Sequence, residues 1–246
     1  MNYAIILAGG KGVRFKGDIP KQFVELTGCP MLVYSMKTAE QNPNVDAICV
    51  VAPEQYHEQV KMWAEQYNIT KMLLLAKSGK ERYQSVYNGI MTIPAKSNDS
   101  VIIMTAVCPF VSQLTMNKLY DMLKEYDACI TVVKATDAIT FSNDGKLVNR
   151  TLQKKKLFVQ QGPQLFRYNV LRQAHEAYLN DEDRKEVNED SELVLNIGVE
   201  CGMVMGDRFC VKVTYPEDLS IVQALYPLFI QQEQRLKMDE EDGTIA

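Results

Sequence analysis

The order of apolar segments along this chain of 246 residues predicts an α/β fold, with a mostly parallel sheet and helices on both of its faces. Short apolar runs typical of buried strands alternate with longer segments whose apolar residues recur at helical spacing. The first run ends in a glycine-rich loop, at residues 8–12. Because ligands of such sheets bind beyond the carboxyl ends of the strands, we expect the loops at 8–21, 77–85 and 104–110 to line one pocket.

The first half of the chain carries most of this alternation. Each expected strand is a short apolar run, and each expected helix is a longer amphipathic segment. The expected strands are 3–7, 47–52, 72–76, 100–105 and 128–133, and the expected helices are 31–41, 53–67, 82–93 and 114–126.

The alternation is interrupted between residues 134 and 165, where we expect a projecting hairpin. Asp144-Gly145 is a turn signal that lies between extended segments at 139–141 and 147–148. A hairpin that projects from an α/β domain is often an oligomerisation arm. We therefore assign residues 137–163 to a β-arm and expect it to join a homodimer.

The alternation returns after the arm. We expect a helix at 168–179, a polar loop at 180–190, a helix from Ser191, strands at 202–205 and 211–214, and a last helix that begins at Pro216. No repeat or linker is evident. A single domain over residues 1–236 is predicted, followed by an acidic tail at 237–246.

Composition and charge exclude several classes of protein. The net charge of −4 argues against a nucleic-acid binder that relies on a global positive field. The six cysteines contain no C-x-x-C pair and only two histidines are present, which excludes a zinc finger and does not fit a disulfide framework. No signal peptide precedes the first strand, and no apolar run approaches the roughly 20 residues of a membrane span. We expect a cytoplasmic protein with no nucleic-acid or membrane partner.

The glycine-rich loop and two cations behind it form the first candidate site. The loop residues singled out are Ala8, Gly9, Gly10 and Gly12. Glycines indicate a backbone that turns sharply or lies against something large. Amides of such a loop, together with the cations of Arg14 and Lys21, suit a polyphosphate, so we interpret both cations as phosphate ligands rather than solvated side chains. The loop is neither a Walker A motif nor a G-x-G-x-x-G turn.

Three further segments are weaker candidates. Gly79 to Ser85 precede a helix, where a glycine leaves room for a base or sugar; the alternative is an ordinary strand-to-helix turn. Lys212 lies at the end of an expected strand, although a lysine between valines can simply point to solvent. One lysine of the run 154–156 could reach an acidic ligand across a dimer interface, but most charge runs are solvated.

Together these stretches resemble the cytidylyltransferases that join CTP to a polyol phosphate. Two branches are close: the 2-C-methyl-D-erythritol 4-phosphate enzymes and the ribitol-5-phosphate enzymes. The resemblance extends from residue 4 to about residue 225. The motifs that carry it are Ile6-Leu7-Ala8-Gly9-Gly10-x-Gly12-x-Arg14, Pro20-Lys21-Gln22-Phe23, Gly79-x-x-Arg82-x-x-Ser85-Val86, Gly162-Pro163-Gln164-x-Phe166 and Val211-Lys212-Val213-Thr214-x-Pro216-Glu217-Asp218-Leu219.

The resemblance implies a Rossmann-like nucleotidyltransferase domain whose β-arm interlocks in a dimer. It implies that Leu7 to Gly10 and Gly79 to Ser85, including Arg82, hold the cytidine. Arg14 and Lys21 would stabilise the α-phosphate as pyrophosphate leaves, and Lys212 would position the attacking phosphate. Lys154, in the partner's arm, would do the same. Mg²⁺ would enter with the CTP triphosphate; the sequence identifies no metal ligands. These roles suit a transfer that depends on positioning and charge neutralisation.

The segment after the fourth strand departs from the family pattern. The family usually has His-Asp-(Ala/Ser)-x-Arg-Pro-Phe where this chain has Met104-Thr105-Ala106-Val107-Cys108-Pro109-Phe110. Thr105 thus replaces an acidic residue, and Cys108 replaces an arginine, which matters where phosphate is bound bidentately. Asp137-Ala138 stands for Asp-Thr, Lys154 for the arm arginine and Gly162 for a threonine. The acceptor side therefore changes while the nucleotide side stays intact.

We favour an enzyme that transfers CMP from CTP to a polyol phosphate, and the Leu-Ala-Gly-Gly opening leans toward the ribitol-phosphate branch. Two alternatives stay open. The departures at Thr105 and Cys108 also suit a non-catalytic nucleotide-binding paralogue, or an enzyme with a different acceptor. A nucleotidyltransferase that uses another base is the second alternative, because the family recognises its base largely through backbone groups.

Overall fold

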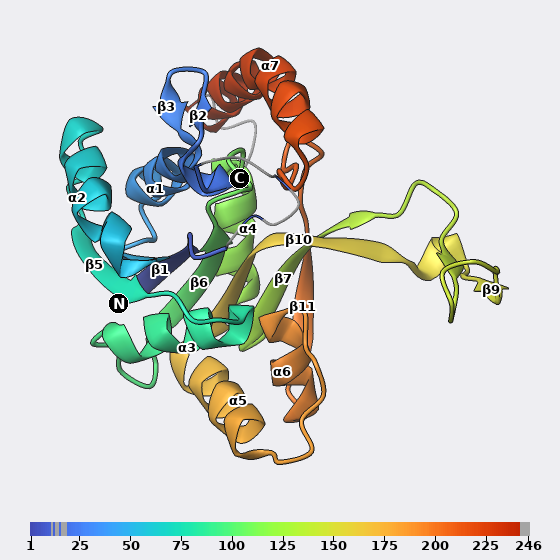
Figure 1. Cartoon of the computed structure of the whole chain (residues 1–246). Helices are drawn as coiled ribbons and strands as arrows, with labels where there is room; N and C mark the ends of the chain where they lie inside the picture. The colour runs from blue at the N-terminus through green and yellow to red at the C-terminus, as the bar shows by residue number, and fades with distance from the viewer. Residues whose placement is uncertain (11, 13–14, 16–18, 242–246) are drawn as a thin grey trace.

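The computed structural model describes residues 1–10, 12, 15 and 19–241, and within them a seven-stranded sheet lies between layers of helices (Figure 1). The strand order is β11-β7-β10-β6-β1-β4-β5. All neighbouring strands are parallel except β10, which is antiparallel to β6 and β7. The predicted fold class is confirmed. The strands are β1 (Asn2–Leu7), β4 (Ala47–Ala52), β5 (Met72–Lys77), β6 (Ser100–Thr105), β7 (Ala128–Lys134), β10 (Phe158–Arg167) and β11 (Cys201–Met205).

The alternation of side chains along the strands supplies both faces of the sheet with apolar residues. In β1, Ala4 and Ile6 pack with α1, α2 and α4, whereas Tyr3 and Ile5 pack with α3, α5 and α6. A third cluster lies under α7 and includes Phe110 and Phe229. The helices are α1 (Met31–Gln41), α2 (His57–Gln66), α3 (Arg82–Thr92), α4 (Gln113–Met122), α5 (Tyr168–Asn180), α6 (Asp190–Asn196) and α7 (Pro216–Glu241).

The strand order reverses at β1. The chain passes from β1 to β4 and β5 on one side of the sheet and then crosses to β6 on the other side. Loops that leave the carboxyl ends of β1 and β6 therefore turn away from each other, and the crevice between them is where ligands of such sheets bind.

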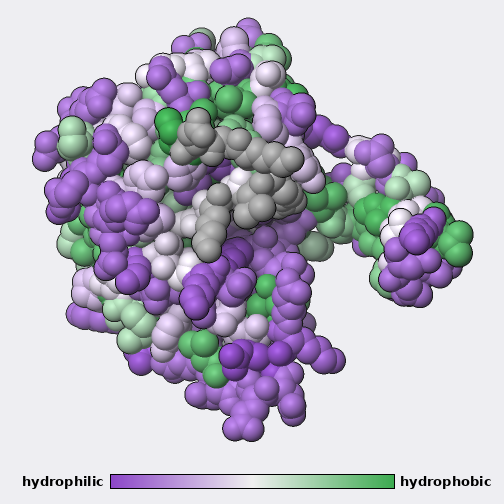
Figure 2. Space-filling model, viewed as in Figure 1, coloured by the Kyte–Doolittle hydropathy of each residue, from purple (hydrophilic) through white to green (hydrophobic). Residues whose placement is uncertain are grey.

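The β-arm projects from the body of the molecule (Figure 1). It contains the short strands β8 (Thr140–Phe141) and β9 (Arg150–Thr151) and the 3-10 turn η3 (Lys154–Lys156). Figure 2 shows apolar surface along it. Its exposed apolar side chains are Phe141, Leu147, Val148, Phe158 and Val159.

The hairpin strands are placed differently from the prediction. The second strand is Arg150–Thr151 rather than 147–148, because the loop between the strands is longer than a tight turn. The Asp144 carboxylate accepts hydrogen bonds from the amides of Lys146 and Leu147, at 2.9 Å each. These bonds keep residues 146–147 within the turn, so the second strand, β9, begins only at Arg150.

The predicted strand at 211–214 is wrong. This segment joins none of the sheets in the described part of the chain, and the Val213 amide donates to Val107 O at 2.8 Å. The amides of Thr214 and Tyr215 instead bond the Asp218 carboxylate, at 2.7 and 2.8 Å, at the start of α7. The segment is thus held by a loop and a helix terminus rather than by a strand.

Two smaller differences concern helix ends. The expected helix 53–67 divides into the 3-10 turn η2 (Glu54–Tyr56) and α2, and the expected helix 114–126 ends at Met122. The other short elements are η1 (Lys21–Phe23), β2 (Glu25–Leu26) and β3 (Cys29–Pro30). Helix α7 continues unbroken past residue 236, so the first residues of the predicted acidic tail are helical. Among the described helices, none combines the length and apolarity needed to cross a membrane.

Candidate active site

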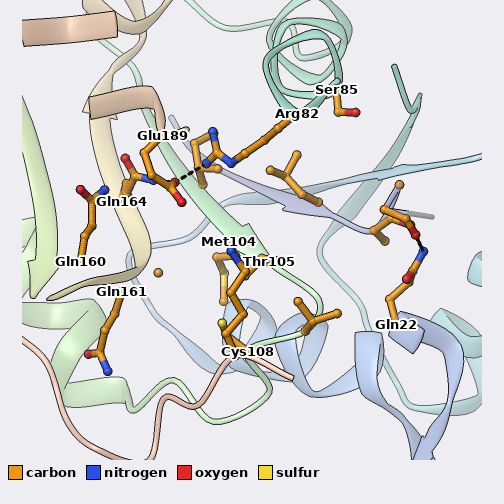
Figure 3. A pocket seen from close by; sticks show the side chains of 18 of the residues that line it. Gln22, Arg82, Ser85, Met104, Thr105, Cys108, Gln160, Gln161, Gln164 and Glu189 are labelled. Carbon is orange, nitrogen blue, oxygen red and sulfur yellow. Dashed lines mark hydrogen bonds and ion pairs between the residues drawn. The ribbon is translucent and has the colours of Figure 1, made fainter. Parts of the chain in front are cut away.

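A cavity of about 530 Å³ opens at the carboxyl ends of β1 and β6, against the first turn of α3 (Figure 3). The three loops that were expected to meet each contribute to its wall. The predicted site residues that line it are Leu7, Ala8, Gly9, Gly10, Lys21, Gly79, Arg82, Ser85, Thr105, Cys108 and Lys212.

The remaining predicted residues do not line this cavity or are not described. Gly12 has φ of +60°, a left-handed conformation that suits glycine. Ala106 is buried in the core, and its amide donates to Leu7 O at 3.0 Å. Asp137 and Lys154 are exposed on the arm. Arg14 lies outside the described residues.

Close packing, rather than room for a ligand, explains Gly9 and Gly79. A Cβ on Gly79 would lie 2.3 Å from the Cβ of Gln84, in the first turn of α3. A Cβ on Gly9 would lie 2.3 Å from the Cβ of Ser78. The expectation that Gly79 leaves space for a base or sugar is therefore corrected: the space beside its Cα is filled by the protein's own helix. Gly9 thus lets the two loops contact each other, and Gly79 lets its own loop pack against the start of α3.

Hydrogen bonds within the 79–85 loop fix the start of α3. Glu81 and Gln84 form a capping box, in which Gln84 Oε1 accepts from the Glu81 amide at 3.1 Å. The Ser85 hydroxyl accepts from the Gly79 amide at 2.9 Å. Ser85 therefore holds the loop in shape at the cavity wall. The N-terminus of α3, with its partial positive charge, faces the cavity and favours an anion there.

Lys21 and Gln22 connect the glycine-rich loop to the segment before α7. Lys21 Nζ donates to Val213 O at 2.8 Å, next to Lys212. Gln22 Nε2 donates to Ala8 O at 2.6 Å and to Gly10 O at 3.1 Å, so its side chain holds the loop from inside. Two lysine cations, Lys21 and Lys212, thereby reach one cavity from distant parts of the chain.

Arg82 is held by two carboxylates. Its Nη2 is paired with Glu189 Oε2, at 2.9 Å (Figure 3). The same nitrogen lies 2.7 Å from Asp190 Oδ2. His175 Nε2 donates to the other oxygen of Asp190, at 3.0 Å, and both of these residues are fully buried. Burial alone would raise the pKa of Asp190, but the Arg82 cation and the bond from His175 hold it well below its usual range. The ion pairs thus anchor the loop at 79–85 to the start of α6.

Three glutamines of β10 form the wall opposite α3. Gln164 Nε2 donates to Glu189 Oε2 at 2.7 Å, and Gln160 shares hydrogen bonds with the Ser191 hydroxyl. Gln161 Nε2 donates to Asp207 O at 3.0 Å and to Cys210 O at 3.3 Å. This wall is polar but uncharged, and its amides hold the loops around it.

The family-divergent residues lie beside this glutamine wall (Figure 3). Thr105 ends β6, and its carbonyl accepts from the Cys108 amide at 3.1 Å, which turns the chain toward the cavity. Cys108 contacts a second thiol there, that of Cys210. This part of the cavity wall is thus built from a hydroxyl, thiols and amides.

The described residues form no cluster of three or more His, Cys, Asp or Glu that could hold a metal ion. The carboxylates that line the cavity are Glu81, which caps α3, and Glu189, which is paired with Arg82. These residues do not fit a metal centre ligated by the protein itself.

Sequence reasoning missed several residues of the wall: Gln22, Gln160, Gln161, Gln164, Glu189 and Cys210. Gln22 and Gln164 stand within the motifs that carry the resemblance, which was a usable signal. Glu189 lies in a charged loop and Cys210 is an isolated thiol, and no local pattern distinguishes either. Only the meeting of distant loops reveals them.

A cavity at the reversal point of a mostly parallel sheet, with a helix N-terminus and two lysines in its wall, defines an α/β protein with a site suited to a phosphorylated ligand. The family model "2-C-methyl-D-erythritol 4-phosphate cytidylyltransferase" (IspD) matches residues 2–227. The Geobacillus thermodenitrificans protein of that name is 33% identical over 231 residues, which cover 92% of this chain and 97% of the relative. The chain therefore belongs to this family of cytidylyl-transferring enzymes.

Other relatives and solved structures agree. The 2-C-methyl-D-erythritol 4-phosphate cytidylyltransferase of Geobacter metallireducens is 33% identical over 228 residues, which cover 90% of this chain and 96% of the relative. The Francisella tularensis enzyme structure of that name has a TM-score of 0.77 at 27% identity, covering 89% of this chain and 97% of that one. The 4-diphosphocytidyl-2C-methyl-D-erythritol synthase of Anaerococcus prevotii, at 24% identity, has a TM-score of 0.80 over 92% and 98% of the two chains and supports the fold alone.

Proposed function

We propose that this enzyme transfers CMP from CTP to a polyol phosphate of the 2-C-methyl-D-erythritol 4-phosphate type and releases pyrophosphate. The observation that carries the proposal is the convergence of the α3 N-terminus, Lys21 and Lys212 on one cavity. The relatives reported above are methylerythritol-phosphate enzymes, which supports that acceptor over ribitol 5-phosphate.

In this mechanism the acceptor phosphate attacks the α-phosphorus of CTP directly, and the pyrophosphate leaves on the opposite side. Lys21, together with Arg14, neutralises the negative charge that develops on the α-phosphate oxygens. Lys212 positions the attacking phosphate, and the loops at 7–10 and 79–85 hold the cytidine. Mg²⁺ would be held by the triphosphate of CTP and would neutralise part of its charge; the described residues include no ligand cluster for it.

The arm is proposed to complete the site in a homodimer. Its exposed apolar side chains, such as Leu147 and Val148, are 69% and 66% exposed in the single chain. Burying them against a second copy would remove apolar surface from water.

Lys154 Nζ donates to Thr136 O at 3.0 Å at the base of the arm. In the dimer we assign Lys154, near Asp137, to the acceptor phosphate in the other subunit's cavity.

A second candidate is a nucleotide-binding protein without turnover. It is favoured by Thr105 and Cys108, which bring neither a carboxylate nor a guanidinium to the acceptor side.

One experiment separates the two candidates. The purified protein is incubated with Mg²⁺, each of the four nucleoside triphosphates and a panel of polyol and sugar phosphates, and pyrophosphate release is followed. Release with CTP and methylerythritol phosphate supports the proposal. Release with CTP and ribitol 5-phosphate would assign the enzyme to the ribitol-5-phosphate branch instead. Tight CTP binding, measured by calorimetry, without turnover on any acceptor would identify the non-catalytic protein.

A further inference from the structure

Cys108 and Cys210 bring two thiols into contact in the cavity wall. They come from different loops, one after β6 and one between β11 and α7. Both side chains line the cavity, and each thiol is the largest influence on the pKa of the other. The Cys210 thiol also donates to Gly162 O at 3.2 Å. The pair therefore faces the space where the acceptor is proposed to bind.

The two loops are already joined by other bonds close to the thiols. The Val213 amide donates to Val107 O at 2.8 Å, one residue before Cys108. Gln161 Nε2 donates to Cys210 O at 3.3 Å and so fixes the backbone of the second loop. These bonds hold together the backbone on both sides of the cavity wall, and a disulfide, with sulfurs about 2.05 Å apart, forms only where the backbone brings two cysteines close.

The surroundings of Cys108 favour its thiolate. The hydrogen bond from Cys210 lowers the pKa of Cys108 despite its burial, and the charges of Lys212 and Lys21 act in the same direction, while Glu189 opposes them. The pKa of Cys210 is raised by the same hydrogen bond and by burial. One sulfur is thus the nucleophile and its neighbour keeps the proton.

We propose that Cys108 and Cys210 are a redox modification site, at which a hydroperoxide converts the two thiols into a reversible disulfide. The Cys108 thiolate attacks one peroxide oxygen, which forms a sulfenic acid and releases water from hydrogen peroxide after protonation. The Cys210 thiol then attacks the Cys108 sulfur and displaces the sulfenic oxygen as a second water. The peroxide is reduced by two electrons and both thiol hydrogens leave as water, so the step balances.

The disulfide covers the acceptor side of the cavity. It would lie between Thr105 and Lys212, where both thiols border the space. We expect loss of turnover on oxidation and recovery with a thiol reductant. This consequence depends on the proposed function, whereas the bond itself does not.

The test maps the bond directly. Native protein is treated with hydrogen peroxide, alkylated, and digested with trypsin without reduction. Cleavage after Lys96, Lys118, Arg208 and Lys212 places the two cysteines in separate peptides, 97–118 and 209–212. The expected product is these two peptides linked, and their separation after reduction. Recovery of both peptides unlinked, with Cys108 reduced or oxidised to sulfinic acid, would overturn the proposal.

Two variants control the result. Cys201→Ser removes a half-buried thiol of β11 that does not line the cavity, and we expect the same linked peptide. Cys210→Ser removes the resolving thiol, and we expect the Cys108 sulfenic acid to accumulate and react with dimedone. Circular dichroism of both variants establishes that they are folded. Linkage of peptide 97–118 to any other cysteine in the folded chain would contradict the assigned pair. Failure of turnover in untreated protein would bear on the proposed function and not on this site.

Discussion

Arg82 connects the nucleotide side of the cavity to α6 through Glu189 and Asp190. The Asp190 side chain is fully buried and accepts from both Arg82 and His175. A buried charge is tolerated only while it is paired, and removing one partner leaves the others unsatisfied. The arginine of the Gly79–Ser85 motif therefore positions the loop that carries it, the loop to which we propose the nucleotide binds.

Asp190→Asn is expected to destabilise the protein by about 3–5 kcal/mol at pH 7, because Arg82 would lose a buried partner. The folded-state pKa of Asp190 lies below its unfolded value, about 3.9. Its stabilisation is present above that pH and is lost as the pH falls toward the folded-state pKa. Urea unfolding should show a difference between variant and wild type that narrows in acid.

Asp121→Asn is the control for this change, since Asp121 is exposed and paired only with Lys124 in an i,i+3 ion pair. It should shift stability by less than about 0.5 kcal/mol. A difference for Asp190→Asn that stays constant from pH 7 into acid would argue that the residue contributes by packing rather than by charge.

Lys21→Ala and Arg14→Ala are each expected to cost about 2–4 kcal/mol of transition-state stabilisation, by analogy with a single donor to a developing anion. The measurement is kcat/KM from pyrophosphate release with CTP and the acceptor found active. Lys61→Ala, which removes an exposed lysine paired with Glu58 on α2, should leave kcat/KM unchanged. Unchanged rates in both site variants would remove the role assigned to these cations.

The first turn of α3 is shaped by its own packing against the loop before it. The absence of a Cβ at Gly79 leaves room for Gln84, and at Gly9 it leaves room for Ser78. A larger residue at either position would force the neighbouring loop to shift. The helix N-terminus is then presented at the cavity by the capping box of Glu81 and Gln84. We therefore expect a substitution at Gly79 to displace the whole N-terminus of α3 rather than to break one contact.

Gly79→Ala is expected to destabilise the protein by roughly 1–3 kcal/mol and to weaken CTP binding, because its Cβ would clash with Gln84 and displace the helix start. Thermal unfolding and calorimetric titration with CTP measure the two effects. Gly10→Ala is the matched control for stability, since a Cβ there meets none of the described residues within 4 Å. Equal unfolding temperatures for the two variants would contradict this prediction, because the loop would then accommodate a Cβ at residue 79 without loss of stability.

The β-arm projects from the molecule and exposes apolar residues that no packing within the single chain covers in the described structure. Its apolar residues stand in solvent, at a distance from the core (Figures 1 and 2). Soluble domains seldom keep such surface exposed unless it is covered by a partner. A dimer in which each arm covers the other subunit would account for it.

Replacing Leu147 and Val148 together by serine is expected to weaken self-association by about tenfold or more, equivalent to about 1.4 kcal/mol or more. Sedimentation equilibrium over a range of concentrations measures the change. Met62→Ser, an exposed apolar residue of α2, should leave association unchanged. A wild-type chain that sediments as a monomer at all concentrations would refute the assembly.

Much of the fold was predictable because it follows local patterns. Strands β4 and β6 and helix α1 have the predicted bounds, since uninterrupted apolar runs and helical spacing identify them. The segment 211–214 has the composition of a strand but lies beside a loop rather than beside another strand. Strand pairing depends on where the rest of the sheet lies. Likewise, the return of the arm at β9 depends on the hydrogen bonds of Asp144.

The glycine-rich loop, Lys21 and Lys212 could be identified from the order and type of residues, because amides and cations suit phosphate wherever they occur. Local pattern also predicts the parallel α/β sheet and the arm. Only the tertiary structure assigns Gly79 to the packing of α3, Arg82 to its ion pairs and Cys108 to its contact with Cys210. Each of these depends on which distant segments meet, and neither spacing nor composition specifies a contact between loops about a hundred residues apart, such as those of Cys108 and Cys210.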